Sequence, residues 1–314
     1  MRLLLRRSVL AVPLLLLVSA LVFALLQAVP GGPLAAYLEN PNVRSEDIAR
    51  LRTAMGLDAP VSVQYVRWLT AFVQGDWGYS YADGRPVLLR VLERVPATLE
   101  LVLSGSMLAL LFAFPLGLVA ATRTWGERLS RVVTTAGVSV PVFWLGLLLQ
   151  LSFAMQLGWL PSSGRQSFGA TGLADRLSHL VLPALVLAVV QGAAWTRYLQ
   201  RSVRDTLALP FVNAGRQRGL SESRLVWRHA LPNALAPFVT VVLLDAAMLA
   251  SGAVVTESVF AWPGVGSLFT EALVKRDYPV LMAFLMVGAV TVIVLNLLAD
   301  LAVARLDPRT REEA

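Results

Sequence analysis

Long apolar segments alternate with polar ones along this chain. Six of the apolar segments approach or exceed the roughly 20 residues that a helix needs to cross a bilayer. They cover residues 8–29, 97–121, 132–157, 179–197, 235–258 and 280–304. Helices are expected there because lipid offers no partner for an unpaired backbone N–H or C=O. The pattern predicts an all-α polytopic membrane protein with six transmembrane helices.

The longest polar interruption between the later apolar segments covers residues 196–233. Only Asp205 and Glu222 oppose its seven arginines, which are Arg197, Arg201, Arg204, Arg216, Arg218, Arg224 and Arg228. Such a basic, helix-compatible segment is typical of a docking element. The alternative is an ordinary basic loop that only sets the topology of the chain.

The distribution of basic residues predicts the orientation. If residues 1–7 lie in the cytoplasm, sixteen of the 27 basic residues fall on that side, together with residues 305–314. Basic residues that flank membrane spans are retained in the cytoplasm. Both termini and the loop at residues 198–233 are therefore expected to be cytoplasmic, and the domain unit at residues 97–304 contains the remaining five spans.

The first span has two interpretations. Arg2, Arg6 and Arg7 precede a long apolar run, as they would in a secretory signal peptide. A removable apolar region is usually 7–15 residues long and ends in a cleavage site of small residues. This run is longer and no such site follows it, which favours an uncleaved anchor.

The segment at residues 30–96 is expected to lie outside and to contain two short helices. Acidic residues follow Ser45, apolar residues recur at helical spacing, and Gly56 can end the first helix. A second apolar pattern ends at Gly75. The segment either packs on the bundle or helps to form a docking surface for a partner. Trp159 and Trp262, in two other outer loops, are expected at the membrane interface.

Composition narrows the possible functions. The chain is 56% hydrophobic and only 15% charged, with a net charge of +7, no cysteine and two histidines. Disulfides, thiolate catalysis and cysteine-based metal sites are excluded, and the positive charge is interpreted as membrane orientation, not nucleic-acid binding. The sequence has no P-loop pattern for binding ATP. We therefore expect no cofactor, no metal and no enzymatic activity.

Acidic residues within apolar segments mark candidate functional positions, since a charge at membrane depth is costly. Asp245 lies within the fifth expected span, and Glu257 lies near its end. Both are candidates for the translocation path, and local packing is the alternative for Asp245. A proton-driven carrier usually needs a clearer relay of paired charges.

The basic segment closely resembles the signature of ABC-importer permeases, an E-A-A triplet followed by glycine and then by Leu-Pro. Here Asn213-Ala214-Gly215 occupies the triplet, Gly219 follows after three residues, and Leu231-Pro232 closes the pattern. Asn213, Gly215 and His229 depart from the general pattern. These departures are similar to the branch that imports dipeptides, oligopeptides and nickel.

The chain resembles the first permease subunit of peptide importers, and this resemblance extends over roughly its whole length. The similar stretches, in order, are 29–33, 56–58, 75–80, 96–101, 141–144, 160–165, 256–264, 276–279 and 307–309.

By resemblance, the basic segment is a helix-turn-helix projection that inserts into a cytoplasmic ATPase subunit. Residues 200–214 and 221–230 can each form a short helix, Gly219 can supply the turn, and Pro232 can end the second helix. Ser221 is expected to cap that helix, with Glu222 in its first turn. The candidate coupling residues are Asn213, Ala214, Gly215, Arg218, Gly219, Ser221, Glu222, Leu225, Val226, His229, Leu231 and Pro232.

The resemblance implies the transmembrane permease subunit of an ABC importer for peptides or a related small solute, in the cytoplasmic membrane of a bacterium or archaeon. Its implied partners are a second homologous permease subunit, one or two cytoplasmic ABC ATPase subunits, an extracytoplasmic solute-binding protein and membrane lipid. The alternatives are a secondary transporter driven by an ion gradient, which would show an inverted internal repeat, and a membrane-embedded enzyme.

Overall fold

The computed structural model describes residues 2–30, 32–34, 44–250 and 253–306. Its regular elements are helices, apart from one isolated β-bridge between Tyr79 and Pro86. The all-α fold class expected from the sequence is confirmed. The motif at residues 307–309 lies outside the described residues.

The chain contains long and short helices. The long ones are α1 (Arg2–Gln27), α5 (Val87–Thr122), α8 (Leu173–Leu207), α11 (Leu231–Ala250) and α14 (Tyr278–Leu306). The shorter ones are η1 (Gly32–Leu34), α3 (Ser45–Ala54), α4 (Val61–Val73), α6 (Thr124–Ser139), α7 (Val142–Leu149), η2 (Gln150–Gln156), α9 (Pro210–Gln217), α10 (Glu222–Arg224), η3 (Leu225–Ala230), α12 (Val254–Val259) and α13 (Val265–Val274).

Within the described ranges, five helices are long and apolar enough to cross a membrane, and a bent pair of helices brings the number to six. The expected count of six spans holds if that pair forms one span. The pair overlaps the third expected span, 132–157, which the structure divides into two helices at Pro141. The helices α6 and α7–η2 meet at 97°, because Val140 precedes Pro141 and takes an extended conformation.

The fifth expected span, 235–258, also differs from the structure. The helical chain begins at Glu222, runs through η3 into α11, and ends at Ala250, while α12 is a separate element. Pro232 therefore does not end a helix, contrary to the sequence expectation. It is the second residue of α11, just after the π-helical turn η3, where the changed hydrogen-bond pattern accommodates a residue that has no N–H.

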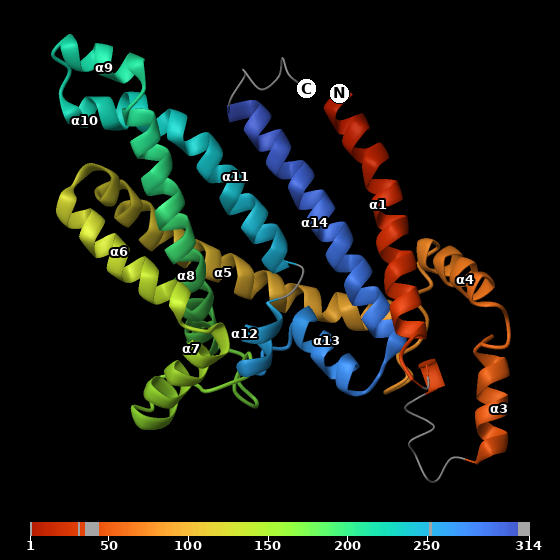
Figure 1. The fold of residues 1–314 in the computed structure, drawn as a ribbon. Coiled ribbons are helices and arrows are strands. Elements are labelled where there is room, and N and C mark those ends of the chain that lie inside the picture. The colour runs from red at the N-terminus through yellow and green to blue at the C-terminus, as the bar shows by residue number, and fades with distance from the viewer. Residues whose placement is uncertain (1, 31, 35–43, 251–252, 307–314) are drawn as a thin grey trace.

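Figure 1 shows the two ends of the bundle. The start of α1, the end of α14, and the pair α9 and α10 lie at one end, which we call the coupling end. The short helices α3, α4, α7, α12 and α13 lie toward the opposite end.

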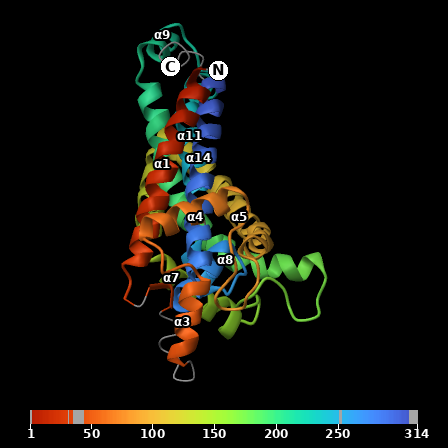
Figure 2. The same ribbon diagram turned by 90° about the vertical axis from the view of Figure 1, so that its right-hand side faces the viewer.

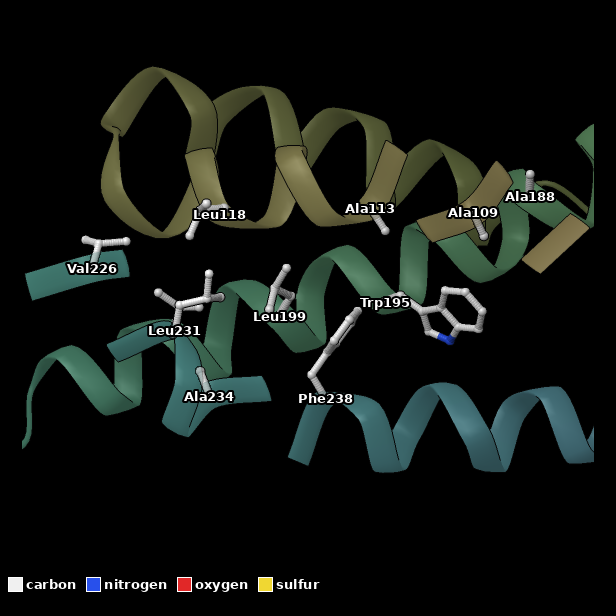
Figure 3. Packing of buried hydrophobic residues seen from close by; sticks show 11 residues of the cluster. Ala109, Ala113, Leu118, Ala188, Trp195, Leu199, Val226, Leu231, Ala234 and Phe238 are labelled. Carbon is white, nitrogen blue, oxygen red and sulfur yellow. The ribbon is translucent and has the colours of Figure 1, made fainter. Parts of the chain in front are cut away.

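The largest buried cluster joins α5, α8 and α11 (Figure 3). It contains Trp195, Leu199, Leu231 and Phe238. Glycines on α5 let the helices approach closely, since a Cβ at Gly105 would lie 2.7 Å from the Cβ of Leu187. This core connects the coupling end to the middle of the bundle.

The two short helices expected in the segment 30–96 are confirmed as α3 and α4. Gly56 and Gly75 follow them with positive φ, at 66° and 89°. The segment is attached to α14 through buried Asp277, which accepts hydrogen bonds from the Ser80 hydroxyl and the Tyr81 N–H. Packing on the bundle therefore accounts for at least part of this segment.

Candidate functional site

The basic segment of the sequence forms a helix-turn-helix at the coupling end. Its first helix was expected at 200–214, but the structure divides that stretch into the end of α8 and the separate helix α9. Leu209 is extended, with φ −68° and ψ 148°, because it precedes Pro210. Pro210 then begins α9 at a position where its missing N–H costs nothing.

Gly219 makes the turn that follows α9, as the sequence predicted. Its φ is +78°, a conformation that glycine adopts without a steric penalty. The Gly219 N–H donates to the Arg216 carbonyl at 3.0 Å, and the Leu220 N–H donates to the Gly215 carbonyl at 3.2 Å. This pair of bonds is a Schellman motif, which satisfies the last carbonyls of a helix.

Gly215, one of the departures from the signature, has a packing reason in this chain. A Cβ at this position would lie 2.8 Å from Cδ2 of Leu225, whose side chain is fully buried. Alanine, the residue of the general pattern, would therefore require the Leu225 side chain between α9 and η3 to shift. The absence of a side chain lets the two arms of the projection close on each other.

The second arm begins at Ser221, whose side chain makes no capping hydrogen bond, contrary to the sequence expectation. Glu222 instead pairs with Arg216 across the turn, with Nε to Oε1 at 2.6 Å. Arg216 also donates to the side chain of Asn213 at 2.8 Å. The exposed Arg216–Glu222 pair cross-links the two arms, and Asn213 holds the Arg216 side chain within the first arm.

The predicted coupling residues divide into two groups in the structure. An exposed group faces away from the bundle: Asn213, Ala214, Arg218, Gly219, Ser221, Glu222 and Pro232. Leu225, Val226 and Leu231 are buried, His229 is half-buried, and Gly215 lies between the arms. Val226 and Leu231 belong to the α5–α8–α11 core, so a displacement of the exposed group would be transmitted to that core.

Three exposed apolar side chains on this projection were not predicted from the sequence. Leu209, Phe211 and Trp227 are 44%, 46% and 57% exposed. They were missed because the segment was interpreted from its charges. A position immediately before or after Pro210, and a tryptophan within an arginine-rich stretch, could have identified them.

Glu257, a candidate for the translocation path, lies fully buried at the opposite end of the bundle. Its Oε1 accepts the Thr98 hydroxyl at 2.7 Å, and its Oε2 accepts the Ser267 N–H at 2.9 Å. The Thr98 hydroxyl oxygen accepts the Val265 N–H at 2.8 Å. A carboxylate and a hydroxyl from two other helices thus cap the first turn of α13, where a negative charge is favoured. In this conformation Glu257 faces no open path.

The turn between α12 and α13 contradicts the expectation for Trp262. Its side chain is fully buried, not placed at a membrane interface, and its Nε1–H donates to the Ala97 carbonyl at 2.8 Å. Ala261 precedes it with φ +46°, which is unfavourable for a residue with a Cβ. We call Val254–Val274, with its partner Thr98, the α12–α13 hairpin.

Asp245, the other path candidate, lies half-buried on α11. Its Oδ2 accepts the Nε1–H of Trp195 at 2.7 Å, and Figure 3 shows Trp195 projecting from α8 beside α11. One turn earlier on α8, Gln191 accepts the Ser106 hydroxyl at 3.2 Å, while its Nε2 has no acceptor among the described residues. Polar groups therefore occupy two successive turns on α8, at Gln191 and Trp195, within the apolar bundle.

Segments far apart in the sequence meet at the end opposite the coupling end. Glu100 binds Arg165 and Arg176, with Nε to carboxylate distances of 2.9 Å and 2.6 Å. Asp277 meets Ser80 and Arg90 in the same way. These contacts join the resembling stretch 96–101 to 160–165 and the stretch 75–80 to 276–279, while Thr98 and Ala97 join 96–101 to 256–264.

Comparisons with known proteins agree with this arrangement. A family model described as "Binding-protein-dependent transport system inner membrane component" matches residues 113–312, and the model of its N-terminal region matches residues 1–102. The oligopeptide transport system permease protein AppB of Bacillus subtilis (strain 168) is 37% identical over 308 residues, 97% of each chain. The glutathione transport system permease protein GsiC of Escherichia coli (strain K12) is 35% identical over 302 residues, 96% of this chain and 95% of the relative.

The fold is similar to that of a chain in the MetNI methionine ABC transporter, solved in inward facing conformations. The TM-score is 0.57 with 16% sequence identity, and the match covers 71% of this chain and 99% of the other.

Proposed function

The chain belongs to the family of binding-protein-dependent transport system inner membrane components and is a permease subunit of an ABC importer. On this premise, we propose that it translocates peptides. We also propose that the exposed projection formed by α9 to η3 couples it to an ATPase. The family excludes the alternative of a secondary transporter. The relatives are named for oligopeptides and for glutathione, which is itself a peptide, so short peptides are the substrate class we infer.

One observation carries the coupling role. The projection exposes Phe211, Trp227 and several arginines, while Val226 and Leu231 of the same segment are part of the core. Exposed aromatic and arginine side chains are typical of interface anchors. Force applied by a partner at the projection would reach α5, α8 and α11 directly.

The remaining assignments follow from this role. The ATPase would bind the coupling end in the cytoplasm, which places both termini there and the segment 30–96 outside. A second homologous permease subunit would complete the path, and a solute-binding protein would deliver the peptide outside. Ser106, Gln191 and Asp245 are the polar groups we assign to the path, while Glu257 has the weaker claim because it is buried.

The experiment is purification of the assembled importer, followed by co-purification, uptake and peptide-stimulated ATPase measurements. Changing Arg218 and Glu222 together to alanine should reduce uptake and ATPase association while the permease stays in the membrane. Normal uptake and association would contradict the coupling role. Reporter fusions after Asp76 and after Arg216 test orientation independently, and an external signal at Arg216 would overturn it.

A further inference from the structure

Two cavities follow one another along the pair α1 and α14, which lie side by side in Figures 1 and 2. The first, of about 440 Å³, lies between the end of α1, α4 and the start of α14. The second, of about 360 Å³, lies between α1 and α14 closer to the middle of the bundle. Neither belongs to the coupling projection or to the polar groups on α8.

The first cavity combines aromatic rings with one charge of each sign. Its lining includes Phe23, Trp68 and Trp77, and it also includes Arg67 and Asp76. Among the described residues, Arg67 forms no ion pair. Within the same set, the Asp76 carboxylate accepts one hydrogen bond, from the Gly78 N–H at 3.0 Å. A cationic and an anionic group are therefore both available to a ligand.

The second cavity is lined by aliphatic side chains, one phenylalanine and one glycine. Val18 of α1 and Leu285 and Gly288 of α14 are among its lining residues. Leu14, which also lines it, is 49% exposed. At 1.5 Å per residue, Phe23 of the first cavity is only about 7.5 Å along α1 from Val18 of the second. Both cavities are lined by α1 and α14, so a ligand lying along this helix pair would extend from the polar lining of the first cavity to the apolar groove of the second.

We propose that these cavities bind one phospholipid with a zwitterionic amino-phosphate headgroup, such as phosphatidylethanolamine. The Arg67 guanidinium would bind the phosphate. Asp76 and the aromatic faces would bind the ammonium group, and one acyl chain would fill the groove beside Gly288. A peptide zwitterion would leave the groove empty. An anionic lipid without an ammonium group would leave Asp76 unmatched.

The test is native mass spectrometry of the purified permease complex with phosphatidylethanolamine and, separately, phosphatidylglycerol. The wild-type protein should retain one phosphatidylethanolamine. Arg67→Ala should weaken its retention by about tenfold, the effect of one charge-assisted hydrogen bond. Arg52→Ala is the matched control, because Arg52 lies on α3 in an exposed pair with Asp58 and outside the cavity. Equal retention in the two variants would overturn the proposal.

Two further arms separate headgroup recognition from folding and from solute binding. Asp76→Lys should shift preference from phosphatidylethanolamine to phosphatidylglycerol, a change that a merely structural role would not produce. Val18→Phe should fill the groove and reduce retention, while Leu17→Phe, at an exposed position outside it, should not. Displacement of the lipid from wild-type protein by a dipeptide, or equal binding of the two lipids, would overturn the lipid assignment.

Discussion

The coupling projection, α9 to η3, and the α12–α13 hairpin both place a residue with positive φ after a helix, but they use different residue types there. Both contain a helix that ends in a residue with positive φ: Gly219 at one end of the bundle and Ala261 at the other. Glycine adopts this conformation freely, whereas a residue with a Cβ pays about 1–2 kcal/mol for it. The residue after Ala261 is buried Trp262, whose hydrogen bond to Ala97 holds the turn in place.

The two regions also differ in whether their polar and aromatic side chains find partners within this chain. The hairpin satisfies its own polar groups, with Glu257 and Thr98 capping α13 in the interior. The projection instead leaves arginines and aromatic side chains exposed. The hairpin is therefore expected to carry stability, and the projection is expected to carry function. The following changes test that division, starting with the largest expected effect on stability.

Replacing Glu257 should have the largest effect. We predict that Glu257→Ala lowers the free energy of unfolding by about 3 kcal/mol, because Thr98 and the Ser267 N–H lose a buried acceptor. Thermal or chemical unfolding in detergent measures the change. Glu271→Ala is the control, since that side chain lies on the same hairpin but is 41% exposed. Equal losses would show that burial of the carboxylate is not what stabilises the hairpin.

A smaller change in the same place is a methyl group at Gly264. Its Cβ would overlap the carboxyl group of Glu257, so Gly264→Ala should cost about 2 kcal/mol through overpacking. The matched variant is Gly172→Ala, where a Cβ meets nothing within 4 Å. Unfolding of both variants under the same conditions checks this, and an unaffected Gly264→Ala would mean that Glu257 can move aside.

Gly219→Val should separate function from stability. A Cβ at Gly219 meets no atom within 4 Å, as at Gly172, but only Gly219 has positive φ. The predicted cost is about 1–2 kcal/mol, confined to the turn, with loss of uptake and weakened ATPase co-purification. Gly172→Val should retain both. Normal transport in Gly219→Val would remove the conformational argument for the coupling turn.

The smallest effect on stability is expected at Asp245, between the two regions. In Asp245→Asn an oxygen acceptor for Trp195 is kept while the charge is lost. We predict a change in unfolding free energy below about 1 kcal/mol, intact assembly and reduced peptide uptake. Unchanged uptake together with unchanged ATPase stimulation would assign Asp245 to packing alone.

The sequence by itself determined the features that depend on local chemistry. The spans follow from long apolar runs, because lipid leaves a helix as the only way to satisfy the backbone of an isolated segment. The turn at Gly219 and the ends of α3 and α4 follow from single glycines that permit positive φ. The projection was predicted because its arginines interrupt an apolar chain, but its exposed apolar residues Leu209, Phe211 and Trp227 were not.

Tertiary structure alone decided which side chains are buried and which segments meet. Trp262, Glu257 and Leu225 lie in polar or turn-rich stretches, so no periodicity predicted their burial. It arises because Thr98 and Ala97, more than 150 residues earlier, supply the partners for Glu257 and Trp262. The bend between α6 and α7 and the continuation of the helix through Pro232 are similar cases. A proline can end a helix, bend it or be accommodated within it, and the outcome depends on whether the surrounding structure satisfies the carbonyl group that the missing N–H leaves unpaired.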